Sequence, residues 1–411
     1  MNLWFNRNIN IIKPLHFIFL IFVAVHSPAC AQDQSAELST ADRQQQVENG
    51  LLTPYFIEGS EPERYTIGER MEYYNVPGMS IAVINNGEVE WCGAYGLVET
   101  GGETTVTDST LFQAASISKP VAAIAALILV EDGVLELDDD VNDYLTTWKI
   151  PDNRNTINNH VSVRKLLNHT SGLTVHGFPG YSKDEVLPTV SEILNGRFPA
   201  NTGSVYTDVE PGEMWRYSGG GYTVLQQLID DVTGESFSHF VQQDVLDELD
   251  MQSSTFEQPL SELNAARTAS GHLDGGSVVE GKWHIYPELA AAGLWTTPSD
   301  LARLAITIQE IINGTSSRLL SVEMTRTMLT PGENGWGLGF RIGGSKRDPF
   351  FSHGGANHGY RAQFIAYANS GKGVIIMTNS DNGGELINEV LRAVADVYDW
   401  PDFQPQKLII E

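Results

Sequence analysis

The sequence has few basic side chains: 25 lysines and arginines stand against 52 aspartates and glutamates in 411 residues, giving a formal net charge of -27. Such a surface repels polyanions, so nucleic acids and anionic lipid surfaces are excluded as partners. Hydrophobic residues make up 41% of the chain, which is typical of a globular protein with a substantial core. The expected partner is a small-molecule or peptide substrate, and the composition does not indicate an oligomeric state.

Cysteine is almost absent, with 2 residues in the whole chain. Cys30 lies in the N-terminal segment, and Cys92 lies in the stretch EWCGAYG, which predicts a strand. Once the N-terminal segment is removed, the single remaining thiol cannot form an internal disulfide, so the fold must depend on its core. We expect Cys92 to be a small core residue.

The N-terminus lacks an apolar run of the roughly 20 residues that a membrane span needs. Its run from Leu15 to Val25 follows the basic residues Arg7 and Lys13 and precedes Ala29-Cys30-Ala31, which resembles a cleavage site. We therefore predict a signal peptide over residues 1–31 and a mature chain that is exported, either periplasmic or secreted, without an integral membrane span. A minor alternative is a lipoprotein acylated on Cys30.

Two common hydrolase motifs are also missing. There is no Gly-x-Ser-x-Gly run, which an ordinary α/β-hydrolase would need, and no H-E-x-x-H run. The 10 histidines are mostly isolated in the sequence, so a zinc hydrolase is not indicated. We expect neither a metal nor a cofactor.

The pattern of hydrophobic residues predicts strands near both ends of the chain and helices between them. Residues 32–50 are polar and predict a flexible leader or a frayed helix start. The expected strands are Met79–Ile84, Val89–Tyr95, Gly337–Ile342, Gly359–Ala368 and Gly373–Thr378. The expected helices are Glu61–Tyr74, one opening near Ser116, Val163–Asn168, Gly221–Asp231, Phe237–Leu249 and Glu385–Tyr398.

This arrangement predicts an α+β fold, an α/β sandwich in which one antiparallel sheet is assembled from both chain ends and flanked by helices. Residues 51–411 would form a single catalytic domain. Within it, residues 51–150 and 286–411 would carry the sheet, and residues 151–285 would form an inserted helical lobe.

The strongest local signal is Ser116-Ile117-Ser118-Lys119-Pro120, followed by a run of small apolar residues to Val130. Proline is tolerated in the first turn of a helix, so Pro120 indicates that a buried helix begins near Ser116. Ser116 and Lys119 are three residues apart and share a helix face. Burial disfavours a charged ammonium, so we expect a lowered Lys119 pKa and a neutral amine able to take the Ser116 proton.

The same spacing recurs at Ser162-Val163-Arg164-Lys165. There Ser162 fits the N-cap of a helix and Lys165 can reach water, so we interpret this copy as structural.

Four further blocks accompany the first copy: Leu166–Leu173 (LLNHTSGL), Pro211–Tyr222 (PGEMWRYSGGGY), Ala292–Leu301 (AGLWTTPSDL) and His353–Gly355 (HGG). With Ser116-Ile117-Ser118-Lys119, which resembles the S-x-x-K motif, they resemble the branch of serine β-lactamases and penicillin-binding proteins that contains class C β-lactamases, D-alanyl-D-alanine carboxypeptidases, D-aminopeptidases and related esterases. The resemblance covers nearly all of the mature chain. It implies a β-lactamase/transpeptidase-like fold and a serine hydrolase that forms an acyl-enzyme on Ser116.

By this resemblance, Tyr217 matches the family's catalytic tyrosine, which moves a proton between the nucleophile, the leaving group and the deacylating water. His353 begins the match to the family's third motif, on a strand that edges the cleft. Its expected role is either to bind a substrate carboxylate or to orient Tyr217.

The resemblance also implies backbone contacts with the substrate. The N–H groups of Ser116 and Ala356 would bind the oxyanion. Gly354 and Gly355 would let the substrate backbone approach closely. Gly219 occupies a position where the family has an asparagine that binds the substrate amide, so that contact must be lost or supplied from elsewhere.

The glycine at 219 and the histidine at 353, where the family often has lysine, both favour an esterase, amidase or peptidase over a dedicated β-lactamase. The expected substrates are D-amino-acid peptides, small esters and β-lactams. Two alternatives stay open: a true class C-like β-lactamase, and a penicillin-recognising sensor that is acylated without turnover.

Overall fold

The computed structural model describes residues 38–408, and the predicted signal peptide lies outside them. Residues 39–408 form one compact unit. In this described part of the chain, no helix is both long enough and apolar enough to cross a bilayer.

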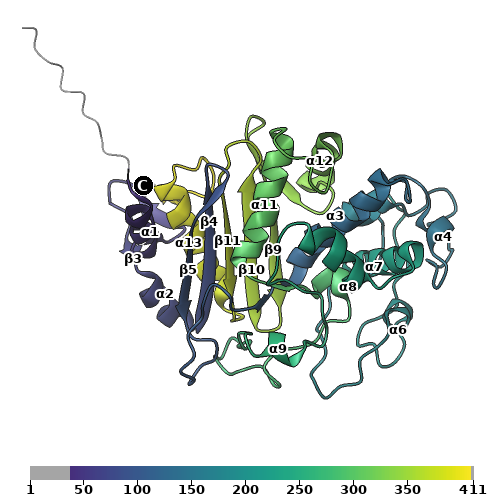
Figure 1. The fold of residues 1–411 in the computed structure, drawn as a ribbon, viewed down its shortest axis with the longest axis horizontal. Coiled ribbons are helices and arrows are strands. Elements are labelled where there is room, and N and C mark those ends of the chain that lie inside the picture. Colours follow the sequence, from purple (N-terminus) through teal and green to yellow (C-terminus); the bar gives the residue numbers. More distant parts are fainter. Residues whose placement is uncertain (1–37, 409–411) are drawn as a thin grey trace, which may run out of the picture. The chain divides into compact units, whose positions relative to one another are not determined.

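The unit is built on an antiparallel sheet of 6 strands in the order β5-β4-β11-β10-β9-β8 (Figure 1). The strands are β4 (Gly78–Asn85), β5 (Glu88–Gly96), β8 (Arg341–Gly344), β9 (Pro349–Asn357), β10 (Tyr360–Tyr367) and β11 (Gly373–Thr378). The N-terminal part of the chain supplies β4 and β5, and the C-terminal part supplies the rest, so the predicted α+β sheet built from both chain ends is confirmed.

The prediction of a strand at Gly337–Ile342 is mostly wrong. The Gly337 N–H donates to the Phe340 carbonyl, so residues 337–340 form a turn, and the strand begins only at Arg341. Gly339 has φ +93, and a Cβ there would lie 2.6 Å from that of Ala123 in α3 (Ser118–Glu131). The glycine is therefore used for close packing against the helix.

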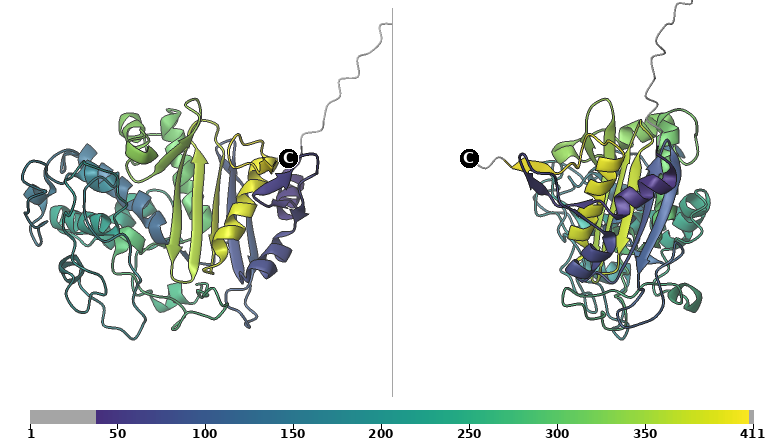
Figure 2. Two further views of the ribbon diagram at one scale, coloured as in Figure 1. Left: turned by 180° about the vertical axis from the view of Figure 1, so that it is seen from behind. Right: turned by 90° about the vertical axis from the view of Figure 1, so that its left-hand side faces the viewer.

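Helices cover both faces of the sheet (Figure 2). On one face lies α11 (Pro298–Ile312), and on the other lie α1 (Thr40–Glu48), α2 (Ile67–Tyr74) and α13 (Gly383–Val397). Two apolar cores result. The first fills the space beneath α1, α2 and α13, and the second joins the α11 face to the helical region.

The helical region lies beyond β8 and β9, around α3 and α7 (Gly219–Thr233). Its remaining helices are α4 (Val141–Tyr144), α5 (Val163–Leu167), α6 (Val190–Asn195), α8 (Phe237–Val241), the π-helix η2 (Gln242–Asp247), α9 (Glu262–Ala265) and α10 (Leu289–Ala292). Both α3 and α10 pack against α7, although they flank residues 151–285 in the sequence. The other short elements are β1 (Leu51–Leu52), β2 (Tyr55–Ile57), β3 (Arg64–Tyr65), β6 (Phe112–Gln113), η1 (Ala115–Ile117), β7 (Trp295–Thr296), α12 (Val322–Met328), η3 (Glu333–Gly335) and β12 (Gln406–Leu408).

One smaller prediction holds in part, and the prediction for Cys92 is wrong. Of the two alternatives for residues 32–50, the described end agrees with the helix: it forms α1, which is held by a capping box at Ser39 and a fully buried Val47 and is therefore not a flexible leader. Cys92 is exposed, not a core residue. The neighbouring Trp91 is buried in the core beneath α1 and α13, and successive side chains in a strand point to opposite faces. Cys92 therefore lies on the α11 face of the edge strand β5, where α11 leaves its side chain exposed.

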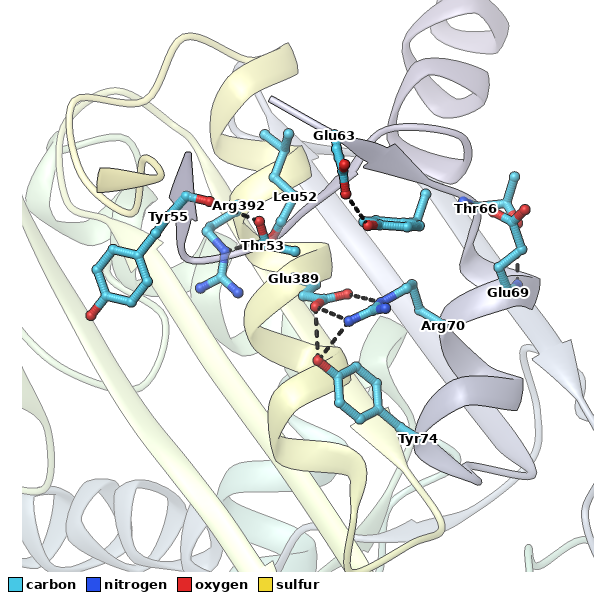
Figure 3. Close-up of polar contacts among 11 residues, drawn as sticks. Leu52, Thr53, Tyr55, Glu63, Thr66, Glu69, Arg70, Tyr74, Glu389 and Arg392 are labelled. Carbon is cyan, nitrogen blue, oxygen red and sulfur yellow. Dashed lines mark hydrogen bonds and ion pairs between the residues drawn. The ribbon is translucent and has the colours of Figure 1, made fainter. Parts of the chain in front are cut away.

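A buried ion pair ties α2 to α13 (Figure 3). The Arg70 guanidinium donates to both carboxylate oxygens of Glu389, with each N···O distance 2.6 Å. The Tyr74 hydroxyl donates to the same carboxylate at 2.8 Å. The Glu389 side chain is 1% exposed. The network therefore satisfies a carboxylate that is costly to bury unpaired.

We expect Arg70→Met to lower the free energy of unfolding by about 3 kcal/mol, because the Glu389 charge would stay buried without its guanidinium partner. Urea unfolding measures this change. The matched control is Arg64→Met, which breaks the exposed Arg64–Asp396 pair between β3 and α13 and should cost less than about 0.5 kcal/mol. Equal losses in both variants would contradict the assigned role of burial.

Candidate active site

The predicted nucleophile lies at the junction of η1 and α3. Ser116 is in η1, and α3 begins at Ser118, so the long helix starts two residues later than the sequence suggested. Pro120 occupies the first turn of α3, where no backbone donor is needed. Ala115 has φ 50, a left-handed conformation that is uncommon for alanine, and the backbone turns sharply just before Ser116.

Ser118 holds this junction in place. Its hydroxyl donates to the Ala115 carbonyl at 2.6 Å and accepts from the Leu294 N–H at 3.0 Å. The second serine of the motif is therefore a structural tie between η1 and the AGLW block. The N–H of Ser116 donates to no acceptor in the part of the chain that the structure describes, so it is available to a ligand.

Lys119 is buried against the nucleophile. Its amino nitrogen lies 3.0 Å from Ser116 Oγ and 2.7 Å from the Ala291 carbonyl oxygen, and the residue is 2% exposed. Burial lowers the pKa of Lys119 from 10.5 to about 7, which confirms the predicted direction. Because a carbonyl oxygen can only accept, one amine hydrogen is committed to Ala291, and the lone pair of the neutral amine is left for the Ser116 hydroxyl.

Tyr217 lies at the same point of the cleft. The Lys119 nitrogen is 4.9 Å from the centre of the Tyr217 ring. Burial raises the pKa of Tyr217, and a side-chain hydrogen bond with Ser116 acts in the opposite direction. The net shift is upward, so the phenol is protonated at neutral pH.

His169, which the sequence analysis did not single out, packs its ring against the ring of Tyr217. The two rings lie 4.2 Å apart between centroids, and His169 is 1% exposed. Its Nδ1 accepts from the Ser218 N–H at 3.2 Å. The only signal in the sequence was its place in the LLNHTSGL block.

His353 is brought to the cleft but is neutral. Its Nδ1 donates to the Gly354 carbonyl at 2.7 Å, so Nε2 carries the lone pair. That Nε2 is buried and has no hydrogen-bond partner among residues 38–408. Burial, with a smaller effect of the Lys119 charge, lowers the pKa of His353 to about 3. Of the two expected roles, binding a carboxylate as a cation is therefore disfavoured.

The cleft has a volume of about 570 Å³ and is lined by Ser116, Lys119, Tyr217, His353, Gly354, Gly355 and Ala356, among others. Strand β9 pairs with β8 only as far as Ser352, so its His353–Asn357 segment pairs with β10 alone. A Cβ on Gly355 would lie 2.3 Å from the Ala114 carbonyl oxygen, whereas one on Gly354 would meet nothing closer than 3.5 Å. Residue 355 must therefore be glycine, because a side chain there would collide with the Ala114 carbonyl. Position 354 has room for a Cβ in ordinary van der Waals contact.

Gly219, expected to contact substrate, does not line the cleft. It is buried under the loop of residues 174–178, and a Cβ there would lie 3.0 Å from both the His176 carbonyl oxygen and the Phe178 ring. The loop occupies the space in which an asparagine side chain would lie. His176 and Phe178 line the cleft in its place.

The loop is held by the N-terminus of α7. The carbonyls of Thr174, Val175 and His176 accept from Ser218 Oγ, Gly220 N–H and Gly219 N–H, at 3.0, 2.9 and 3.0 Å. Val175 has φ 63, which is rare for a β-branched residue. These bonds fix a strained loop at the mouth of the cleft.

Trp336 is a second residue that the sequence did not indicate. It lines the cleft, its ring centroid is 5.6 Å from that of His353, and its indole N–H has no acceptor among the described residues. With Phe178 and the ring of His176 it gives the cleft a largely aromatic wall.

The second Ser-x-x-Lys copy is structural, as expected. Ser162 caps α5 by accepting from the Lys165 N–H, and the Lys165 amine donates to the His160 carbonyl at 2.7 Å. In residues 38–408, no three or more histidine, cysteine, aspartate or glutamate side chains gather in a way that could hold a metal ion.

Known proteins resemble this chain in sequence and in fold. The profile of the family described as Beta-lactamase matches residues 64–399. Protein flp of Staphylococcus aureus (strain MW2) is 28% identical over 226 residues, which cover 55% of this chain but only 42% of that protein's length. Penicillin-binding protein 4 of Amycolatopsis lactamdurans is 24% identical over 334 residues, covering 78% of this chain and 85% of that protein.

Solved structures show the same fold. The octameric penicillin-binding protein homologue from Pyrococcus abyssi superposes with a TM-score of 0.67 at 25% identity, covering 81% of this chain and 76% of that one. The D-amino acid amidase from Ochrobactrum anthropi SV3, complexed with L-phenylalanine amide, gives a TM-score of 0.65 at 21% identity, covering 87% and 99% of the two chains.

The lowered pKa of Lys119 makes stability depend on pH. Between about pH 7 and the ordinary lysine value of 10.5, the unfolded chain binds one more proton than the folded chain, so the free energy of unfolding rises with pH. We expect Lys119→Met, which removes this group, to be more stable than the unchanged protein by about 3 kcal/mol at pH 7, allowing for two lost hydrogen bonds. The difference should shrink as pH rises towards 10.

Urea unfolding of both proteins at pH 7, 8.5 and 9.5 measures this difference. Lys346→Met, which removes an exposed lysine, serves as the control and should give a small difference that does not change with pH. A pH-independent difference for Lys119→Met would show that the buried amine keeps its proton at neutral pH.

Proposed function

Because this chain belongs to the β-lactamase family, we propose that it is a serine hydrolase that acts by acyl transfer through an ester of Ser116, on amides and esters of D-amino acids and their short peptides. The observation that carries the proposal is the 3.0 Å contact between Ser116 Oγ and the buried amine of Lys119. A neutral amine in this position turns a weak nucleophile into a reactive one.

Acylation would begin when the Lys119 lone pair takes the Ser116 proton while Oγ attacks the substrate carbonyl carbon. The Ala291 carbonyl holds the amine in place through its N–H, at 2.7 Å. The unpartnered N–H of Ser116 and the N–H of Ala356 are the proposed donors to the oxyanion. The bond from carbon to the leaving nitrogen or oxygen then breaks, and the leaving group takes a proton.

Tyr217 is the proposed donor of that proton. Burial keeps the phenol protonated, and the Lys119 amine beside its ring can return a proton to it. In the second half of the reaction a water molecule attacks the ester carbonyl carbon and gives a proton to the same pair of groups. The bond from carbon to Ser116 Oγ breaks, Oγ takes a proton back from that pair, and the acid leaves. The protein is thereby restored.

The chemistry of the cleft supports the substrate class. His353 is neutral and presents a lone pair, so it suits a substrate N–H donor better than a carboxylate. The aromatic wall of Trp336 and Phe178 suits an apolar side chain. The D-amino acid amidase of the same fold was solved with L-phenylalanine amide, a molecule that combines an amide with an aromatic side chain. We also propose that the protein acts after export, as the N-terminal sequence predicts.

The proposed function is tested with the purified protein and a panel of D-amino acid amides, short-chain chromogenic esters, D-alanyl peptides and nitrocefin. Turnover of amides or esters supports the proposal. Turnover of nitrocefin alone would favour a class C-like β-lactamase. Stoichiometric release of the leaving group, with an acyl-enzyme stable in a mass spectrum, would favour a sensor.

We expect Ser116→Ala to abolish formation of the acyl-enzyme, and Lys119→Ala and Tyr217→Phe each to lower kcat by about 10³-fold or more, because residues of one catalytic set are not additive. Ser162→Ala is the matched control. It removes the cap of α5, which costs about 1 kcal/mol of stability, but it should leave kcat unchanged. Near-normal turnover by Lys119→Ala at neutral pH would overturn the role of the amine.

We expect kcat/KM to rise with pH through a midpoint near 7, because the neutral form of Lys119 is the active one and burial places its pKa at about 7. His353, with its pKa lowered to about 3, stays neutral throughout this range. A pH series from 5 to 9 with one ester substrate measures the midpoint. A rate that falls as pH rises from 6 to 8 would contradict the mechanism.

A further inference from the structure

A second cavity, of about 160 Å³, lies along α13 and is lined by Tyr55, Asn388, Arg392, Gln404 and Gln406, among others. Its polar side-chain groups are a guanidinium, a phenol and amides, of which only the guanidinium is charged. The lining includes no carboxylate, although the whole chain carries 52 acidic residues.

The guanidinium of Arg392 is unusual because it is half-buried and has no carboxylate partner in the described chain. Its Nε donates to the Leu52 carbonyl at 2.7 Å, while neither Nη atom has a hydrogen bond or ion pair in the described chain (Figure 3). The carboxylates of Glu385 and Glu389 act on it only from a distance, and Glu389 is already bound by Arg70. Burial lowers the pKa of Arg392, so the charge is held in a partly desolvated site that an anion would stabilise.

This cavity adjoins the active-site cleft, with Asn388 in the lining of both. The cleft extends from Ser116 along β9 to Gly384 and Asn388 of α13. Gly384, Asn388 and Arg392 are spaced by four residues, so they follow one face of the helix. At 1.5 Å per residue, they cover about 12 Å, which is roughly the length of four residues of extended peptide.

The cavity is also an addition to the family domain. The profile match ends at 64 and 399, while Tyr55, Gln404 and Gln406 lie outside these limits. The segments that carry them are joined by the parallel pair of β2 and β12, in which Tyr55 is opposite Gln406. Chain segments on either side of the catalytic domain therefore close this cavity over the helix.

We propose that the cavity around Arg392 is a distal subsite that binds the carboxylate of an extended, peptide-like substrate whose reactive carbonyl lies at Ser116. The proposal rests on the proposed acyl-transfer function. The two free Nη atoms suit a bidentate carboxylate, the side-chain amide of Gln406 adds a donor, and the ring of Tyr55 covers an apolar part of the ligand. Gln404 Nε2 already donates to the Trp400 carbonyl at 3.0 Å, which leaves one of its two hydrogens for the ligand.

The test uses thioester donors built on D-alanine. One short donor, N-acetyl-D-alanyl thioester, reaches only the cleft. The extended donors add four residues and end either in a carboxylate or in the matching amide, with the extension on the acyl side in one series and on the leaving-group side in the other. The proteins are the unchanged chain, Arg392→Gln, Arg392→Lys and the control Arg326→Gln, which removes an exposed charge in α12.

In one of the two series we expect the unchanged chain to prefer the carboxylate donor over its amide by about tenfold in kcat/KM, the effect of one charge-assisted contact. Arg392→Gln should remove the preference, Arg392→Lys should keep part of it, and Arg326→Gln should keep all of it. All four proteins should hydrolyse the short donor equally. Equal rates with carboxylate and amide in both series, or a preference that survives in Arg392→Gln, would overturn the subsite.

Failure of the proposed function gives a different result, because then no donor, short or extended, is hydrolysed. Binding decides the subsite in that case. Calorimetry with Ser116→Ala protein and the extended carboxylate and amide peptides, without a reactive group, should show tighter binding of the carboxylate that disappears when Arg392→Gln is added. Equal binding of the two peptides would overturn the subsite whatever the protein catalyses.

Discussion

The candidate site depends on one buried amine. Lys119 lies among apolar residues of α3 with no carboxylate partner in the described chain, and its contacts are a hydroxyl and a carbonyl. An ammonium in such surroundings is costly, whereas an amine is satisfied by one acceptor and one donor. The rest of the local structure maintains this situation: the turn at Ala115 places Ser116, Ser118 ties the junction to Leu294, and α10 presents the Ala291 carbonyl.

The sequence could predict what depends on local pattern. The proline after Lys119 located the helix start to within two residues, the hydrophobic pattern located the strands β4 and β5, and the motif blocks indicated the fold. The sequence could not predict the Ala291 carbonyl, the indole of Trp336 or the support of Tyr217 by His169, because each is a contact between distant segments. Cys92 was misplaced for a related reason: a strand pattern does not say that a strand lies at the edge of a sheet, where a helix covers its side chains incompletely.

The missing asparagine shows how a local change and a distant loop are connected. Glycine at 219 removes a side chain, and the carbonyls of Val175 and His176 then accept hydrogen bonds from the free N–H groups at the start of α7. The loop reaches this position only with Val175 in a left-handed conformation, which no sequence rule would assign to valine. His176 and Phe178 thus line the cleft because residue 219, which does not line it, is a glycine.

Helix α13 is clamped by the Arg70–Glu389 pair and packed on the sheet along its length. A rod of 15 residues held in this way has a fixed length of about 22 Å. Whatever binds beside it meets groups at set intervals, with no hinge to absorb a mismatch. The helix would therefore select ligands by length. Molecules one or two residues too short or too long would bind less tightly even if their chemical groups were the same.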